Sequence, residues 1–245
     1  MRRESGGSNT EPHDLLLSVA EQLKVPLTII ARQAELEDMN GGMIGGGLSD
    51  AAHVHTQAAA ALQLVDSYML GLELLRSQTE LELEPVSVSS TLVDTAHHLE
   101  RFARQHGVEL ELRIAGRYEP VMAHGRGLRA ALLSLGFALA EAVGASEVRK
   151  LKVITLATHR SPRGIVAGMY SAEGQGFTAA SWRRALQLNG YATQAFTAAS
   201  AGSGAGFFVA DAILRSMQTR LRVGRYDHQP GMSAVFQPSQ QLHFV

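Results

Sequence analysis

Cysteine is absent from the 245 residues of this sequence, which excludes a disulfide framework, a thiol nucleophile and a thiolate zinc site. An excess of charge of either sign is also absent, because 22 lysine and arginine residues stand against 23 aspartate and glutamate residues. The formal net charge of −1 gives no electrostatic reason to expect binding to nucleic acid or to an anionic membrane surface.

Long hydrophobic runs are missing as well. Polar residues interrupt every apolar stretch before the roughly 18 residues that a membrane span needs. The start, MRRESGGSNTEPHD, lacks the apolar segment of a signal peptide. The apolar content of 45% is nevertheless enough for a buried core. We therefore expect a cytoplasmic globular protein of one or two domains, without membrane insertion.

Two segments in the N-terminal part have the apolar spacing of a helical bundle, alternating between four and three residues. They are Leu16, Ala20, Leu23, Leu27, Ile30 and Ala34, and then Val54, Ala58, Ala61, Val65, Tyr68, Leu72 and Leu75. The run NGGMIGGG at 40–47 separates them, and so many glycines end a helix. The pattern predicts an antiparallel helical hairpin over 13–82, after a flexible tail over 1–12.

A lone hairpin buries only one stripe of each helix. Two hairpins that pair in a four-helix bundle bury more, so a homodimer is expected. The alternative is a hairpin that folds against the second domain of its own chain.

The pattern changes after residue 82. Val86 and Val88 indicate a short strand, with Ser89 and Ser90 as the N-cap of the next helix. Further helices are expected over 91–106, 126–143 and 205–217, and strands over 108–114, 148–157, 164–171, 219–225 and 232–237. Helices and mostly antiparallel strands in this order predict an α+β sandwich with helices on one face of the sheet.

Residues 19–27 read VAEQLKVPL. This segment resembles V-S-H-E-L-R-T-P-L of the sensor histidine kinases, where the histidine accepts phosphate. Aligned on Pro26, the phosphoacceptor position is Glu21 and its acidic neighbour is Gln22. Val25 stands where the family has the threonine that positions water for dephosphorylation. The resemblance implies that no phosphohistidine forms. Glu21 either imitates a phosphorylated histidine through its fixed charge or is a solvated surface charge.

Residues 128–142 read LRAALLSLGFALAEA and resemble the family's L-x-Q-x-L-x-N-L-x-x-N-A helix. In the family the two asparagines bind the magnesium ion that bridges the phosphates. Here Ser134 and Ala138 occupy those positions. Serine offers one weak oxygen ligand and alanine offers none, whereas Mg²⁺ requires near-octahedral oxygen coordination.

Two glycine segments complete the resemblance. AEGQG at 172–176 is similar to D-x-G-x-G, in which the aspartate accepts a hydrogen bond from adenine, and GSGAG at 202–206 is similar to G-x-G-L-G. Ala172 replaces the aspartate, and Glu173 is expected on the opposite side if the segment is extended. The matching glycines of a nucleotide site, whose backbone N–H groups suit a phosphate, are Gly174, Gly176, Gly202, Gly204 and Gly206.

The resemblance covers about residues 13–238 and implies a dimerising hairpin over 13–82, followed by an ATP-binding domain over 83–245 that has lost its metal and adenine ligands. It implies a pseudokinase of two-component signalling without a cofactor. Its partners would be a second copy and a response regulator receiver domain or partner kinase, contacted through Glu21, Lys24, Val25, Thr28 and Arg32.

Two alternatives remain open. The first is an active or residually ATP-binding histidine kinase, with ATP and Mg²⁺ as its ligands. The second is an anti-sigma-like switch of the same superfamily, against which the two bundle-type segments argue.

Overall fold

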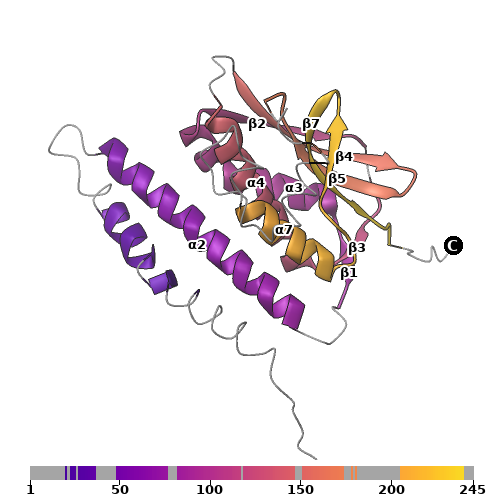
Figure 1. Cartoon of the computed structure of the whole chain (residues 1–245), viewed down its shortest axis with the longest axis horizontal. Helices are drawn as coiled ribbons and strands as arrows, with labels where there is room; N and C mark the ends of the chain where they lie inside the picture. The colour runs from indigo at the N-terminus through magenta and orange to yellow at the C-terminus, as the bar shows by residue number, and fades with distance from the viewer. Residues whose placement is uncertain are drawn as a thin grey trace, which may run out of the picture. The chain divides into compact units, whose positions relative to one another are not determined.

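The computed structural model describes residues 20, 23–25, 27–36, 48–76, 82–116, 118–146, 151–173, 178, 180 and 205–239. The chain divides into two compact units, residues 1–76 and 77–245 (Figure 1). The first unit is helical, and the second combines helices with strands.

The first unit contains a helical segment over residues 27–36 and the long helix α2 (Leu48–Arg76). Lys24 Nζ and Asp66 Oδ1 lie 2.6 Å apart, so the two parts of the sequence are in contact. Three alanines at the predicted bundle positions are buried, whereas three larger apolar residues at such positions, Leu23, Ile30 and Val54, are exposed. The glycine turn lies outside the described residues, and the four-helix bundle stays a prediction.

The second unit is built on a five-stranded mixed sheet. The strand order is β2 (Val108–Ile114), β4 (Lys152–Ser161), β5 (Gly164–Tyr170), β7 (Gln229–Phe236) and β6 (Arg222–Tyr226). Strands β2 and β4 are parallel and the other neighbours are antiparallel. A parallel pair needs a crossover connection, and the helix that follows β2 provides it.

Three helices cover one face of this sheet: α3 (Val88–Gln105), α4 (Gly125–Gly144) and α7 (Ala205–Ser216) (Figure 1). They enclose the core together with buried strand residues such as Leu156, Ile165 and Met169. This arrangement confirms the predicted α+β class. By length and composition α4 could cross a membrane, but 72% of its apolar window is buried inside the protein, as in a core helix.

The start of α3 differs from the prediction. Ser87 is the N-cap, and its hydroxyl accepts a hydrogen bond from the backbone N–H of Ser90. Val88 therefore opens the helix, and the assignment of Val88 to a strand with Ser89 and Ser90 as caps was wrong. The preceding strand is β1 (Glu84–Val86), which pairs with β3 (Val121–Ala123), a strand that the sequence pattern did not predict.

The other strand boundaries shift as well. Strand β4 was predicted to end at 157 but continues to Ser161. Strand β7 begins at 229 rather than 232, because Asp227 and His228 alone form the turn after β6, both with positive φ. Such two-residue turns usually contain glycine, so the sequence did not reveal this one.

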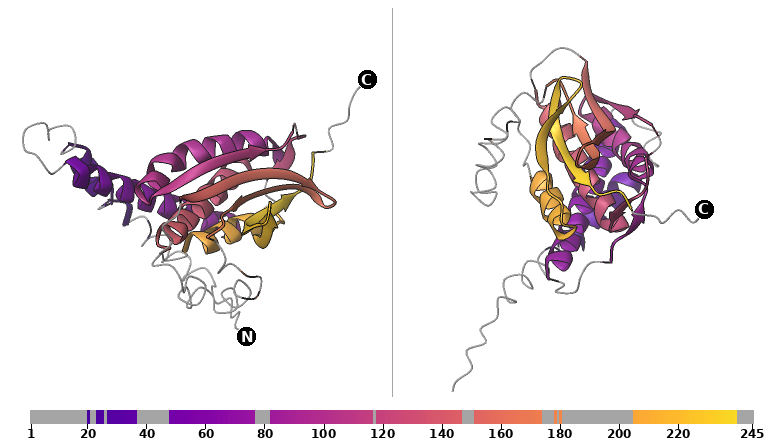
Figure 2. Two further views of the ribbon diagram at one scale, coloured as in Figure 1. Left: turned by 90° about the horizontal axis from the view of Figure 1, so that it is seen from above. Right: turned by 90° about the vertical axis from the view of Figure 1, so that its right-hand side faces the viewer.

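The sheet is twisted and curved (Figure 2), and the turn after β6 comes into contact with a side chain of the opposite edge strand. Arg113 on β2 and Asp227 beside β6 form an ion pair with an Nη1–Oδ2 distance of 2.5 Å. In a flat sheet four strand spacings would separate these edges by roughly 19 Å. The curl also buries Thr155 and Tyr170, which alternate with the helix-facing residues and point to the second face.

Substitution of Gly136 on α4 tests the contact between α3 and α4. A Cβ atom at this position would collide with the side chain of Leu99, which is 1% exposed. We expect Gly136→Ala to lower the free energy of unfolding by about 1–3 kcal/mol through overpacking. The same change should lower the free energy of unfolding less in a Leu99→Ala background, because the space left by the shortened side chain accepts the new methyl group.

Urea unfolding of the two single variants and the double variant measures this coupling. Leu151→Ala is the control, since that side chain is 66% exposed and should change stability little. Additive effects of Gly136→Ala and Leu99→Ala would contradict the packing.

Candidate functional site

The first turn of α7 packs directly against the backbone of α4 at Gly206. A Cβ atom on Gly206 would collide with the carbonyl oxygen of Ser134 and lie 3.0 Å from the Cβ of Ala138. Ser134 and Ala138 are one helical turn apart and face this contact, with exposed fractions of 1% and 6%. The two positions predicted to replace the magnesium ligands therefore lie together against the third predicted residue, Gly206.

This contact offers almost no metal-binding chemistry. The hydroxyl of Ser134 is buried and has no hydrogen-bond partner among the described residues, and Ala138 contributes only a methyl group. A buried hydroxyl without a partner costs about 1–3 kcal/mol. No cluster of three metal-ligating His, Cys, Asp or Glu side chains occurs in the part of the chain that the structure describes.

The segment after β5 forms a turn rather than an extended strand. In this turn Ala172 is exposed, whereas the preceding residue, Ser171, is fully buried. The hydroxyl of Ser171 donates a hydrogen bond of 2.6 Å to Oε2 of Glu173, and its backbone N–H donates to the carbonyl oxygen of Pro230. The condition under which Glu173 would point to the opposite side, an extended segment, is not met, because residues 172–173 form a turn and the Ser171 hydroxyl bonds the carboxylate.

The Ser171–Glu173 pair was missed by the sequence reasoning. A serine followed two residues later by a carboxylate at the end of a strand is typical of a local turn stabilised by side chains. That spacing was a signal for this contact. The structure therefore holds one carboxylate next to Ala172, where the family resemblance places an aspartate.

Helix α7 carries a buried carboxylate near its middle. Asp211 is 3% exposed, its Oδ2 lies 2.7 Å from Nη2 of Arg215, and its Oδ1 accepts a hydrogen bond from the backbone N–H of Leu221. Burial raises the pKa of the Asp211 carboxyl above its usual value, and the charge of Arg215 offsets this effect only in part. The hydrogen bond to Leu221 ties α7 to the segment that leads into β6.

The sequence matches no protein-family model and no curated protein. Among solved structures, full-length ShkA in complex with AMPPNP aligns with a TM-score of 0.57 and 18% identity, over 92% of this chain and 46% of that one. The Acinetobacter baumannii histidine kinase AdeS aligns with a TM-score of 0.49 and 12% identity, over 90% of this chain and 98% of that one. The mycobacterial sensor histidine kinase MprB aligns with a TM-score of 0.44 and 17% identity, over 64% of this chain and 99% of that one.

This chain has a histidine-kinase-like fold. It spans less than half the length of ShkA. Of the predicted nucleotide-site residues, Ser134, Ala138 and Gly206 lie in contact with one another. Ala172 lies in the turn at the end of β5. The remaining predicted positions of the nucleotide site and phosphoacceptor segment lie outside the described residues: Glu21, Gln22, Gly174, Gly176, Gly202 and Gly204.

The predicted partner-binding residues that the structure describes belong to the first unit. Val25 and Arg32 are exposed, whereas Lys24 pairs with Asp66. The hydroxyl of Thr28 donates a hydrogen bond of 2.7 Å to the carbonyl oxygen of Lys24. Val25 and Arg32 are therefore the accessible members of this group.

Replacement of Asp211 by asparagine should change how stability depends on pH. Because the pKa is higher in the folded state, protonation of Asp211 favours folding. This contribution is complete below the unfolded-state pKa of roughly 3.9 and is lost as the pH rises through the raised folded-state pKa. Asp211→Asn keeps an uncharged acceptor for Leu221 at every pH, so the variant should gain stability relative to the wild type as the pH rises.

Urea unfolding of both proteins from acid to neutral pH measures this difference, with Asp94→Asn on the exposed face of α3 as the control. A difference between Asp211→Asn and the wild type that stays constant over this range would contradict the assignment.

Proposed function

We propose that this chain is a pseudokinase of two-component signalling, which regulates a partner without transferring phosphate. The histidine-kinase-like fold, which aligns with ShkA over 92% of the chain, supports the general assignment to this kind of protein. The observation that carries the loss of catalysis is the contact of Ser134 and Ala138 with Gly206.

The contact leaves no magnesium site of the kinase type. Two asparagine side chains would present carbonyl oxygens to the ion, whereas Ser134 and Ala138 present one buried hydroxyl and one methyl group. Mg²⁺ requires near-octahedral oxygen ligands and gives up its water reluctantly. Without the ion, the negative charges of a triphosphate remain unscreened.

Adenine recognition is weakened in the same way. Ala172 has no acceptor for the adenine amino group, and an unmet buried hydrogen bond costs about 1–3 kcal/mol. Since 1.4 kcal/mol corresponds to about a tenfold change in affinity, the loss at this position alone lowers ATP affinity by roughly 5- to 150-fold. The loss of the metal adds to it.

The helical unit supports partner binding in place of catalysis. Several large apolar side chains are exposed there, among them Leu23, Val25, Ile30 and Val54. Contiguous exposed apolar surface marks protein interaction sites. We propose that this surface mediates homodimerisation, and that Val25 and Arg32, with Glu21, Lys24 and Thr28, contact a receiver domain or a partner kinase in the cytoplasm.

Residual ATP binding is a second candidate function, and the Ser171–Glu173 hydrogen bond favours it. The carboxylate of Glu173 lies in the same turn as Ala172 and is an acceptor that adenine could use. In this case Glu173→Gln should reduce ATP affinity, whereas a pseudokinase that does not bind ATP should be unaffected.

Nucleotide binding tests the proposed function. Millimolar ATP with Mg²⁺ should leave the melting temperature of the wild type unchanged, whereas ShkA, which was crystallised with AMPPNP, serves as the positive control. Ala172→Asp restores the acceptor at an exposed position and should raise affinity about tenfold over Ala172→Asn. Addition of Ser134→Asn and Ala138→Asn should raise it further if the variant folds, as judged by circular dichroism. Micromolar ATP affinity of the wild type would contradict the pseudokinase proposal.

Sedimentation tests the homodimer. At low micromolar concentration the wild type should sediment as a dimer, and Leu23→Glu with Ile30→Glu should give monomers, because buried charges oppose apolar packing. Leu151→Glu, at an exposed position of the second unit, should leave the dimer intact. A monomeric wild type would be evidence against this interface.

A further inference from the structure

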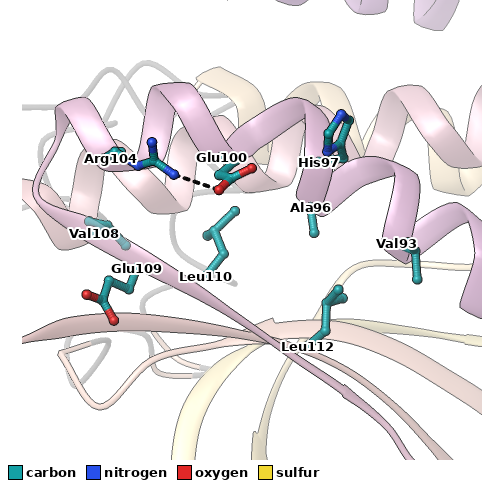
Figure 3. A pocket seen from close by; sticks show the side chains of 9 residues that line it. All are labelled: Val93, Ala96, His97, Glu100, Arg104, Val108, Glu109, Leu110 and Leu112. Carbon is teal, nitrogen blue, oxygen red and sulfur yellow. Dashed lines mark hydrogen bonds and ion pairs between the residues drawn. The ribbon is translucent and has the colours of Figure 1, made fainter.

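A groove of about 600 Å³ lies between α3 and strand β2 (Figure 3). Val93 and Ala96 line it from the helix, and Leu110 and Leu112 line it from the strand. The helix and strand diverge towards Val93 and Leu112, whose side chains are 44% and 42% exposed. The apolar surface of the groove is therefore open at the edge of the sheet.

Strand β2 is itself an edge strand. It pairs with β4 on one side, and among the described residues no strand pairs with its other side. The outward N–H and C=O groups of such a strand can pair with another chain. Charged side chains on an edge strand usually prevent such pairing. The arrangement of the charges on β2 therefore decides whether a second chain can pair with this strand.

The two faces of β2 carry different chemistry. Leu110, Leu112 and Ile114 lie on the face towards the helices, as their register with Ile154, Leu156 and Thr158 shows. Glu111 and Arg113 lie on the other face, with Oε1 of Glu111 3.0 Å from Nε of Arg113. The apolar face is uniform, and the polar face carries opposite charges two residues apart.

We propose that β2 is a self-association site, at which two copies of this chain pair edge to edge in antiparallel orientation, with Leu112 opposite Leu112 of the partner subunit. The two sheets then form one continuous sheet about a two-fold axis, with the helices of both copies on the same face. This interface is independent of the helical unit and of nucleotide binding.

The charges select the register of this pairing. Residues that face each other across the axis must lie on the same face of the sheet. An axis at Leu110 places Glu109 opposite the partner's Glu111. An axis at Glu109, Glu111 or Arg113 places that charged residue opposite its own copy. Like charges directly opposite each other destabilise a sheet.

An axis at Leu112 avoids every like-charge pair. It places Glu111 opposite the partner's Arg113, and Leu110 opposite the partner's Ile114. The two-fold axis generates each of these pairs twice. Leu112 meets its own copy at the axis, where its exposed surface and that of Val93 become covered. Of the axes at residues 109–113, Leu112 is the one at which both faces of β2 are self-complementary.

The interface is short, because this register pairs residues 110–114 of each copy. It is therefore expected to be weaker than the homodimer of the helical unit and to form above the low micromolar range. A covalent probe captures such a weak complex.

The absence of cysteine makes that probe specific. Full-length Leu112→Cys should form a disulfide dimer under mild oxidation, because facing Cα atoms of antiparallel strands lie roughly 4.5–5.5 Å apart, within the range of disulfides. Leu151→Cys, which is exposed but not on β2, is the control. We expect cross-linking at 112 to be about tenfold faster than at 151.

The register gives a second test. Glu111→Cys alone should cross-link slowly, whereas its mixture with Arg113→Cys should give a mixed dimer. Glu111→Lys in the Leu112→Cys background should slow cross-linking by about tenfold, because two positive charges then face each other. Circular dichroism melts show whether these variants remain folded.

Three outcomes would overturn the proposal. They are equal rates at 112 and 151, faster self-cross-linking at 111 than at 112, and protection of the β2 amides in the wild type without a cross-link at 112. The last result would mean that a different occupant covers the edge. Wild-type amide exchange that slows in β2 as protein concentration rises supports the proposal without any substitution.

Discussion

The close approach of α4 and α7 at Gly206 is the constraint on which the candidate site depends. No side chain fits at Gly206, since a Cβ atom would collide with the backbone of Ser134. The approach places Ser134 and Ala138 in a dry contact between helices rather than at the wall of an open pocket. Asp211, farther along α7, pairs with Arg215 on the same helix and accepts a hydrogen bond from Leu221, which ties α7 to the segment before β6.

The same contact gives a packing reason for small residues at positions 134, 138 and 206. A glycine at the start of α7 serves the approach of two helices, and this steric role does not require a nucleotide. Small residues at 134 and 138 serve it too. The surroundings of Ala172 are different, because Ser171 and Glu173 retain a polar hydrogen-bonded pair at the end of β5. The contact at Gly206 thus contains one buried hydroxyl and no charged group, whereas the turn at Ala172 keeps one carboxylate.

The turn between β6 and β7 comes close to Arg113 and gives this side chain two partners. Arg113 pairs with Glu111 on its own strand and with Asp227 from the opposite edge. The contact lies on the second face of the sheet, on which Tyr226 also stacks with His159 at a ring-centre distance of 5.2 Å. It lies on the face of β2 opposite the groove. Arg113 therefore links the edge strand β2 to the turn between β6 and β7.

Local features of the sequence determined the helices and the general class of fold. The apolar run from Leu128 predicted α4 within one residue at each end, because the periodicity of a helix is written in neighbouring residues. The two bundle-type segments and the four motif segments likewise depend on spacing along the chain. They sufficed to predict a histidine-kinase-like fold, which the alignment with ShkA supports.

Contacts between distant residues were decided by the tertiary structure. The parallel pairing of β2 with β4, the small β1–β3 sheet and the Arg113–Asp227 ion pair join segments that no local pattern relates. The Ser171–Glu173 bond is local and its spacing was a signal, but whether it forms depends on the turn at the end of β5. Strand pairing and side-chain contacts depend on which surfaces meet after the chain folds, and the period of a single strand records only which of its faces is buried.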